Sequence, residues 1–369
     1  MIAVIFGTTG ELIKLAPVIR GLQAGGDPVF LACTNQQATQ IPAMLSDFRL
    51  PQPDVQLAMG RRGRDLEILA DIPFWLGAML RGAPVSRRRI RAAFSSAQTL
   101  PLVLVHGDTM TTVLGAAIGR TMRVRVAHVE AGLRSGDWRN PFPEEIDRLL
   151  TSKLADLHYA PGAWAVGNLR RAGVSGEVVD IQANTVRDSL AMVPAGGLED
   201  LPTEAFGLVS IHRFELLGNA TRLEEVIGAL HHASRQVPIL FIDHPVTAAA
   251  IRDAHLEHYF DERFTRVPRR RYYEFIRLLK AAQFLVTDSG GSQEECAVLG
   301  VPCLVHRAAT ERLDGLDGGP VVLSRMDRTA LVDFLADPDR HRRPDTVGQR
   351  SPSEIIVADL RARGYTAPA

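Results

Sequence analysis

The chain has 369 residues, 42 basic ones (Lys and Arg) balanced by 42 acidic ones, and 46% hydrophobic residues. This length corresponds to about two domains, each large enough to bury its own core. The charge balance argues against a nucleic-acid partner, since nucleic-acid-binding proteins carry a basic surface. No apolar run approaches the roughly 20 residues of a membrane-spanning helix, so we expect no membrane partner either.

Residues 1–6 are apolar, but they lack the basic start and the small-residue cleavage site of a signal peptide. We therefore interpret them as a buried first strand. The three cysteines, Cys33, Cys296 and Cys303, share no CxxC spacing. This count and spacing argue against a disulfide framework and against a structural zinc site. A cytoplasmic location is the resulting expectation.

Short apolar runs rich in β-formers alternate with longer amphipathic stretches, which predicts βαβ units and parallel sheets. In the first half we expect strands at residues 2–6, 29–33, 102–106, 124–129 and 157–160. The pattern starts again in the second half, with strands expected at residues 207–211, 238–242, 284–287 and 302–305. The predicted fold class is α/β, with two Rossmann-like doubly wound domains.

Residues 191–204 mix Gly, Pro and acidic residues without periodicity, which is typical of a linker. This predicts an N-terminal domain over residues 1–190 and a C-terminal domain over residues 205–350. Apolar residues at helical spacing after Ser351-Pro352 predict a closing helix within residues 351–369. Arginine runs at residues 61–64, 87–91 and 269–271 have acidic neighbours, and we interpret them as solvated surface.

Polar residues follow several predicted strands of the first half. The turn Gly7-Thr8-Thr9-Gly10 opens a helix and suits a phosphate, although an ordinary helix start has the same composition. Asp108 follows another strand and is either a helix cap or a site residue. Glu130 ends a third strand, and Glu144 with Glu145 occupies the first turn of a helix begun by Pro143, where acids are ordinary dipole partners.

Three carboxylates gathered from separate strand ends can act as an acid/base group. Mutual repulsion and burial separate their pKa values, so that one member accepts a proton while another donates one. In the second half, Ser289-Gly290-Gly291 opens a helix and forms an anion cradle, and Glu295 lies one turn further on, suited to ribose hydroxyls. His212 and Arg213 directly follow a strand and suit a pyrophosphate.

Six segments carry a family resemblance, and they occur in the order HGDTMTT, HVEAGLRSGD, PFPEEIDR, ANTVRDSL, TDSGGSQEE and ATERLD. In this order and spacing the chain resembles the UDP-N-acetylglucosamine 2-epimerase family over essentially its whole length. The resemblance implies the two-Rossmann-domain (GT-B) architecture of retaining glycosyltransferases. It also implies an active site in the cleft between the domains and a last helix that crosses back to the first domain.

The resemblance further implies an isomerase that needs no metal or nicotinamide cofactor. Such an enzyme inverts carbon 2 by eliminating UDP to a 2-acetamidoglucal and adding UDP back. By motif position, the implied catalytic residues are Asp108, Glu130, Glu144 and His212. The implied substrate-binding residues are Thr9, Lys14, Arg134, Arg148, Arg213, Asp288, Ser289, Gly290, Gly291, Glu295 and Arg312.

Several positions depart from the family pattern. Thr9 and Gly10 stand where the family usually has Arg-Pro, and Phe214 stands where a second Arg is common. The segment after Asp314 lacks the usual Gly-Thr-Asn, and Asp243-His244-Pro245 belongs to a shortened His-x-Asn-Pro stretch. Loss of one charge-assisted contact to phosphate costs ~1.5–3 kcal/mol if nothing replaces it.

Three functions are therefore open at this point. The first is a non-hydrolysing epimerase acting on UDP-GlcNAc or a related UDP-sugar, and the second is a hydrolysing epimerase that releases UDP and free ManNAc. The third is a glycosyltransferase or nucleotide-sugar-binding protein that has lost epimerisation. The resemblance also implies a homodimer, and the segment Asn35-Gln36-Gln37 partly resembles the site at which a second UDP-GlcNAc activates family members.

Overall fold

The computed structural model describes residues 1–58, 72–137, 142–196 and 202–367. The chain forms two compact units, the first from residues 1–192 and 350–369 and the second from residues 193–349. The predicted linker lies partly outside the described residues, and the arginine run at 61–64 lies wholly outside them. Among the described helices, none has the length and apolar composition needed to cross a bilayer.

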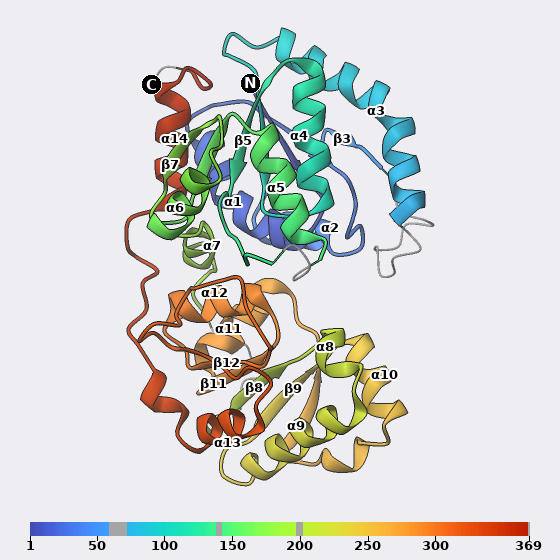
Figure 1. The fold of residues 1–369 in the computed structure, drawn as a ribbon, viewed down its shortest axis with the longest axis vertical. Coiled ribbons are helices and arrows are strands. Elements are labelled where there is room, and N and C mark those ends of the chain that lie inside the picture. The colour runs from blue at the N-terminus through green and yellow to red at the C-terminus, as the bar shows by residue number, and fades with distance from the viewer. Residues whose placement is uncertain (59–71, 138–141, 197–201, 368–369) are drawn as a thin grey trace. The chain divides into compact units, whose positions relative to one another are not determined.

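The first unit is built on a seven-stranded parallel sheet in the order β3-β2-β1-β4-β5-β6-β7 (Figure 1). Its strands are β1 (Ile2–Phe6), β2 (Val29–Cys33), β3 (Val55–Gln56), β4 (Leu102–His106), β5 (Arg125–Val129), β6 (Leu157–Ala160) and β7 (Glu177–Asp180). The strand order reverses between β1 and β4. In such sheets, ligands bind at the carboxyl ends of the strands on either side of this reversal.

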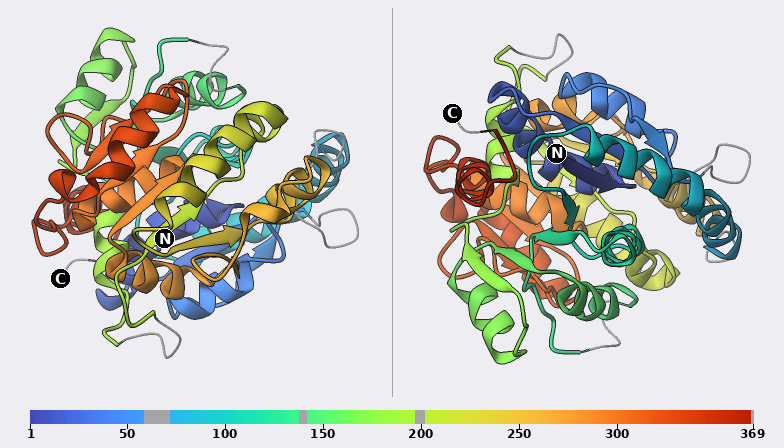
Figure 2. Two further views of the ribbon diagram at one scale, coloured as in Figure 1. Left: turned by 90° about the horizontal axis from the view of Figure 1, so that it is seen from below. Right: turned by 90° about the horizontal axis from the view of Figure 1, so that it is seen from above.

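Helices cover both faces of this sheet (Figure 2). They are α1 (Thr9–Ala24), α2 (Ile41–Asp47), α3 (Ile72–Ser95), α4 (Met110–Met122), α5 (Glu144–Leu154), α6 (Ala163–Arg171), α7 (Val186–Ala191) and α14 (Pro352–Ala362). Ala3 and Ile5 of β1 pack with Trp75 of α3 and Ile118 of α4 in one core. Alternate residues of a strand point to opposite faces, so the remaining residues of β1, which are also buried, face the other helix layer.

The C-terminal helix α14 belongs to this first unit and packs against α1 and α7. Ser351 caps it, and the backbone N–H of Ser353 donates to Asp188 Oδ2 at 2.8 Å. Asp359 accepts from the Tyr159 hydroxyl at 2.9 Å, which links the helix to β6. The closing helix predicted from apolar spacing is thus present, and these contacts attach it to the first unit.

The second unit repeats the same topology with a six-stranded parallel sheet in the order β10-β9-β8-β11-β12-β13 (Figure 1). Its strands are β8 (Gly207–Ser210), β9 (Ile239–Asp243), β10 (Phe264–Pro268), β11 (Phe284–Thr287), β12 (Cys303–Val305) and β13 (Val321–Leu323). Its helices are α8 (Phe214–Leu217), α9 (Ala220–Ala233), α10 (Pro245–Asp253), α11 (Tyr272–Ala281), α12 (Gly290–Leu299) and α13 (Arg328–Ala336), with short 3₁₀ helices at Glu257–Tyr259 and Pro338–His341.

All nine predicted strands are present, but four have different bounds. Strand β5 begins at Arg125 because the N–H of Val124 donates to Gly119 O at 3.0 Å and closes the end of α4. Strands β9 and β12 begin one residue later than predicted, since Pro238 and Pro302 have no N–H for a ladder. Strand β8 ends at Ser210, one residue early.

Candidate active site

Glu11 joins the turn after β1 to the turn after β4. One carboxylate oxygen accepts the N–H groups of Gly7 (2.7 Å) and Thr8 (2.8 Å). The other accepts the hydroxyls of Thr109 (2.5 Å) and Thr112 (3.2 Å). Burial raises the pKa of Glu11, while these hydrogen bonds favour the charged form. Glu11 therefore fixes the geometry of both turns.

Thr9 begins α1 and contacts the turn after β2. Its N–H and its hydroxyl both donate to Gln37 Oε1, each at 2.8 Å, and the N–H of Gln37 donates to Gly7 O at 2.9 Å. Gly7 is required here, because a Cβ at this position would lie 1.9 Å from Thr34 Oγ1. The position where the family usually has Arg thus carries a short side chain that hydrogen-bonds within the protein.

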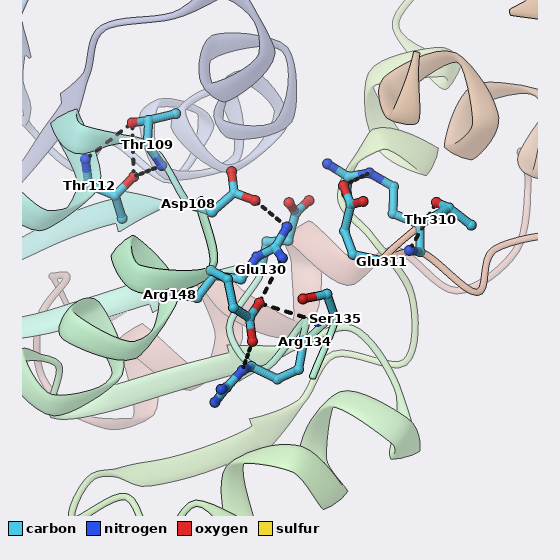
Figure 3. Close-up of polar contacts among 12 residues, drawn as sticks. Asp108, Thr109, Thr112, Glu130, Arg134, Ser135, Arg148, Thr310 and Glu311 are labelled. Carbon is cyan, nitrogen blue, oxygen red and sulfur yellow. Dashed lines mark hydrogen bonds and ion pairs between the residues drawn. The ribbon is translucent and has the colours of Figure 1, made fainter. Parts of the chain in front are cut away.

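Asp108 follows β4 and is a site candidate, because Thr109 and not Asp108 caps α4. The carboxylate of Asp108 forms an ion pair with Arg148 of α5 (Figure 3). Gly107 before it has a φ of +70°, which an L side chain rarely adopts. This turn directs the carboxylate toward α5, so the interpretation of Asp108 as a cap is wrong.

Glu130 follows β5, the strand next to β4 in the sheet. Its side chain is 4% exposed, and it forms an ion pair with Lys14 of α1 and a hydrogen bond with the amide of Asn184. His106 Nε2 lies 3.7 Å from Glu130 Oε2. Lys14 offsets the charge of a carboxylate that is almost fully buried.

Helix α5 carries Glu144 and Glu145 in its first turn, as predicted. Glu145 is buried and accepts from Arg134 Nε at 2.5 Å, Arg148 Nη1 at 3.1 Å and the N–H of Ser135 at 3.2 Å (Figure 3). Glu145 therefore does more than interact with the dipole of α5. Glu145 positions Arg148, the residue that pairs with Asp108.

Glu144 and Asp147 lie three residues apart on α5. Glu144 Oε2 and Asp147 Oδ2 are buried and have no hydrogen-bond partner among the described residues. Burial, reinforced by the charges of Asp108 and Glu144, raises the pKa of Asp147 to about 7. No role for Asp147 was predicted from the sequence, although its spacing of three from Glu144 places both residues on one helix face.

In the second unit, Asp288 organises the loop after β8. Its carboxylate accepts the backbone N–H groups of His212 (2.9 Å) and Arg213 (2.7 Å), and His212 Nδ1 lies 3.3 Å away. Burial lowers the pKa of His212, while the charge of Asp288 opposes this shift. Asp288 thus orients His212 and Arg213 through their backbone.

His244, at the N-terminus of α10, lies beside His212, with ring centroids 4.8 Å apart. Its Nε2 is 3.3 Å from Ser210 Oγ, and burial lowers the pKa of His244 to about 4. From the sequence, this segment was identified only as a shortened motif. His244-Pro245 follows a predicted strand, and this position could have indicated a second imidazole in this loop region.

Ser289 caps α12, and its hydroxyl accepts the N–H of Ser292 at 3.4 Å. Gly290 allows close approach of a cation, since a Cβ there would lie 2.7 Å from Arg312 Nε. Arg312 Nη1 is 2.7 Å from Glu294 Oε1. Gly291 follows in the first turn. This end of α12 therefore combines helix N–H groups with an oriented arginine, a combination suited to an anion.

Glu295 is buried one turn into α12. Burial, reinforced by the charge of Glu295, raises the pKa of Tyr272 well above its usual value. The loop after β12 carries Glu311, which is 3.3 Å from the buried Arg307. Among the described residues, no cluster of three His, Cys, Asp or Glu is placed to bind a metal ion.

Comparison with known proteins identifies similar chains. The family model described as UDP-N-acetylglucosamine 2-epimerase matches residues 89–352. The UDP-N-acetylglucosamine 2-epimerase of Bacillus subtilis is 30% identical, over 96% of this chain and 93% of the relative.

Two solved structures are similar over nearly the whole chain. The UDP-GlcNAc 2-epimerase of Methanocaldococcus jannaschii, in complex with UDP-GlcNAc and UDP, has a TM-score of 0.76 and 27% identity, over 97% of this chain and 99% of that one. The UDP-GlcNAc 2-epimerase of Neisseria meningitidis, bound to UDP-GlcNAc, has a TM-score of 0.80 and 25% identity, over 97% and 99% of the two chains.

Proposed function

The chain belongs to the UDP-N-acetylglucosamine 2-epimerase family, and we propose that it interconverts UDP-GlcNAc and UDP-ManNAc, or a related UDP-2-acetamido sugar, without hydrolysis. The family, the α/β fold with two Rossmann-like units and the enzyme class predicted from the sequence are confirmed. We further propose that UDP binds to the second unit, over residues 205–350. The acid/base group would belong to the N-terminal domain of residues 1–190, and the helix within residues 351–369 would cross back to this domain.

The observation that carries this proposal is the setting of the three candidate carboxylates. Asp108 is paired with Arg148, Glu130 with Lys14, and one oxygen of Glu144 is buried without a partner among the described residues. Asp108 and Glu130 follow neighbouring strands, so their side chains start from the same edge of the sheet. Carboxylates in different environments can divide proton removal and proton donation between them.

The proposed reaction needs two such groups. One base removes the proton from carbon 2, the freed electron pair forms the carbon 1–carbon 2 double bond, and the bond from carbon 1 to the phosphate oxygen breaks, so that UDP leaves. In the second half, the electron pair of the carbon 1–carbon 2 double bond takes up a proton that an acid delivers to the other face of carbon 2, and a UDP oxygen bonds to carbon 1 again. We assign these two roles to Asp108 and Glu130, with Glu144 as the third member.

The second unit supplies groups suited to the departing diphosphate. His212 and Arg213 are oriented by Asp288, and Arg312 lies against the first turn of α12. Cations and helix N–H groups stabilise charge that develops on a leaving phosphate. We propose that these groups hold UDP between elimination and readdition, with Glu295 binding the ribose hydroxyls.

The hydrolysing route is the second candidate function, and the contact of Thr9 favours it. Thr9 hydrogen-bonds to Gln37 where the family usually has a positive charge, and Phe214 is 85% exposed where a second Arg is common. With two cations fewer, UDP would be held less tightly after elimination. Water would then add to the intermediate and free ManNAc would leave.

Proton NMR in deuterium oxide separates these functions. Purified protein is incubated with UDP-GlcNAc, and the signal of the proton on carbon 2 is followed over time. Deuterium at carbon 2 together with UDP-ManNAc supports the non-hydrolysing route, whereas free ManNAc and UDP support hydrolysis. If UDP-GlcNAc and other UDP-sugars all keep their carbon-2 proton, both epimerase proposals fail.

We also propose that the protein is a cytoplasmic homodimer that a second UDP-GlcNAc activates. The three free cysteines are buried, which is compatible with a reducing compartment. Gln36 Oε1 accepts from Thr111 Oγ1 at 3.0 Å, next to the Thr9–Gln37 contact. An activator at residues 35–37 would therefore act on the first turn of α1. Sedimentation tests the dimer, and hyperbolic kinetics in the reverse direction, without added UDP-GlcNAc, would count against activation.

A further inference from the structure

Asp147 is an acidic side chain inside the candidate acid/base group. It lies on α5, three residues after Glu144 and next to Arg148, which pairs with Asp108. The residue is 7% exposed, and its Oδ2 atom is buried without a hydrogen-bond partner among the described residues. A buried carboxyl oxygen without a donor is unfavourable when charged, so the position favours a protonated carboxyl.

The charges around Asp147 also favour a protonated carboxyl. Asp108, from the turn after β4, and Glu144, on the same helix, both add negative charge. The cation nearest in sequence, Arg148, also pairs with Glu145 at 3.1 Å, and Glu145 binds Arg134. The positive charges of Arg148 and Arg134 on this side of α5 are therefore already paired with other acids, and they compensate Asp147 less.

Among the described residues, helix α4 and strand β5 pack against α5, and neither changes this balance. Helix α4 contains one charged residue, Arg120, which pairs with Asp156 at 2.8 Å. Strand β5 contributes Arg125, which pairs with Glu177 at 3.1 Å, and His128, whose pKa burial lowers to about 4. His128 is therefore neutral near pH 7.

We propose that Asp147 is a positioning residue for the epimerisation proposed above, on which this inference rests. Asp147 keeps a proton near neutral pH, so its side chain does not add a negative charge to the acid/base group. Burial and the charges of Asp108 and Glu144 raise the pKa of Asp147 to about 7, in agreement with this role. Its sequence neighbours Glu144 and Arg148 then remain available to the substrate and to Asp108.

The sign of the resulting pH dependence follows directly. Below its pKa of about 7, Asp147 is mostly protonated and neutral. As the pH rises through 7, Asp147 ionises and adds a negative charge beside Asp108 and Glu144, which disfavours the approach of an anionic UDP-sugar. The ratio kcat/KM should therefore fall on the alkaline side, by up to about tenfold per pH unit for one ionisation.

Carbon-13 NMR of the aspartate carboxyl groups tests the protonation state without substrate. We expect the ¹³C-labelled protein to show one carboxyl resonance that titrates near pH 7 and that is missing in Asp147→Asn. If no aspartate resonance of the unmodified protein titrates between about pH 6 and 8, or if such a resonance persists in the variant, the proposal is overturned.

The pH profile of kcat/KM for UDP-GlcNAc then tests the role in the reaction. The matched control is Asp333→Asn, which neutralises an exposed acid of α13. We expect the alkaline fall in the unmodified protein and in the control, and a flatter profile in Asp147→Asn, whose side chain stays neutral. An unchanged fall in Asp147→Asn contradicts the proposal. Absence of turnover in all three proteins contradicts the proposed function instead, and the NMR titration still decides the state of Asp147.

Discussion

Acidic side chains have opposite uses in the two units. In the first unit, a basic side chain holds each of two acids, since Lys14 pairs with Glu130 and Arg148 pairs with Asp108. The acids are therefore the groups presented by the strand ends, and the cations compensate their charge.

In the second unit the relation is reversed. The carboxylate of Asp288 accepts hydrogen bonds from the backbone N–H groups of His212 and Arg213. Glu294 Oε1 lies 2.7 Å from Arg312 Nη1. Here the presented groups are the imidazole and the guanidinium groups, and the acids orient them. On the proposed assignment, similar topologies therefore support different tasks, which are proton transfer in the first unit and anion binding in the second. Substitutions in the first unit should lower kcat, and those in the second should weaken nucleotide binding.

The largest expected effect follows from neutralising a carboxylate of the proposed acid/base group in the first unit. Glu130→Gln keeps the shape of the side chain but cannot take up a proton, so kcat should fall by about 10²- to 10⁴-fold. Asp108→Asn should have an effect of the same order. Initial rates and deuterium exchange at carbon 2 measure the loss, and thermal unfolding verifies that the variants are folded.

Glu225→Gln, which changes an exposed acid on α9, is the matched control and should keep the original rate. If Glu130→Gln turned over substrate as fast as this control, Glu130 would not belong to the acid/base group.

The next effect concerns nucleotide affinity. Arg213→Met removes a cation that we assign to the diphosphate, which should cost ~1.5–3 kcal/mol, or about 10- to 100-fold in the Kd for UDP. Isothermal titration calorimetry with UDP measures this change. Arg222→Met, at an exposed position on α9, is the control. Equal Kd values for the two variants would remove Arg213 from the UDP site.

The strands in the interior of each sheet could be predicted from the sequence. Among the described residues, the four strands not predicted are β3, β7, β10 and β13, and these are the edge strands of the two sheets. An edge strand pairs on one side only and is partly solvated, so it lacks the continuous apolar run that marks a buried parallel strand. Strand β7, with the sequence EVVD and exposed ends, is an example.

The site was predictable only in part, because its partners are distant in sequence. The acids at strand ends could be identified from their position, but Lys14 and Glu130 are 116 residues apart, and no spacing rule connects them. Glu145 and Arg148, by contrast, follow the i,i+3 rule and could have been paired. The state of Asp147 depends on burial and on neighbouring charges, which only the fold determines.

A smaller effect is expected in the pH dependence of substrate binding. Burial lowers the pKa of His212 in the free protein, and a bound diphosphate favours the protonated imidazole. Binding therefore takes up a proton, and affinity should fall as the pH rises through the His212 pKa toward 7, by less than tenfold per unit. The Glu130→Gln variant allows the Kd of intact UDP-GlcNAc to be measured at each pH. His212→Asn should flatten this dependence, and a profile that stays steep would exclude His212 as its source.

An effect that can be as small as about twofold tests the missing positive charge in the first unit. Thr9→Arg adds the cation usual in the family but loses the hydroxyl contact to Gln37, and the two changes oppose each other. A charge-assisted contact contributes ~1.5–3 kcal/mol and a neutral one about 1 kcal/mol, so the Kd for UDP should decrease by roughly two- to thirtyfold. Thr9→Ser, which retains the hydroxyl, is the control.

The products of Thr9→Arg also bear on the two epimerase routes. If the unmodified protein releases free ManNAc because UDP is held weakly, the added arginine should raise the share of UDP-ManNAc. An unchanged product ratio together with tighter UDP binding would show that retention of UDP does not decide the outcome. The difference between the routes would then have to lie in whether the first unit's carboxylates promote the addition of water to the intermediate. The next position to vary would be Glu144, which has one buried oxygen without a partner among the described residues.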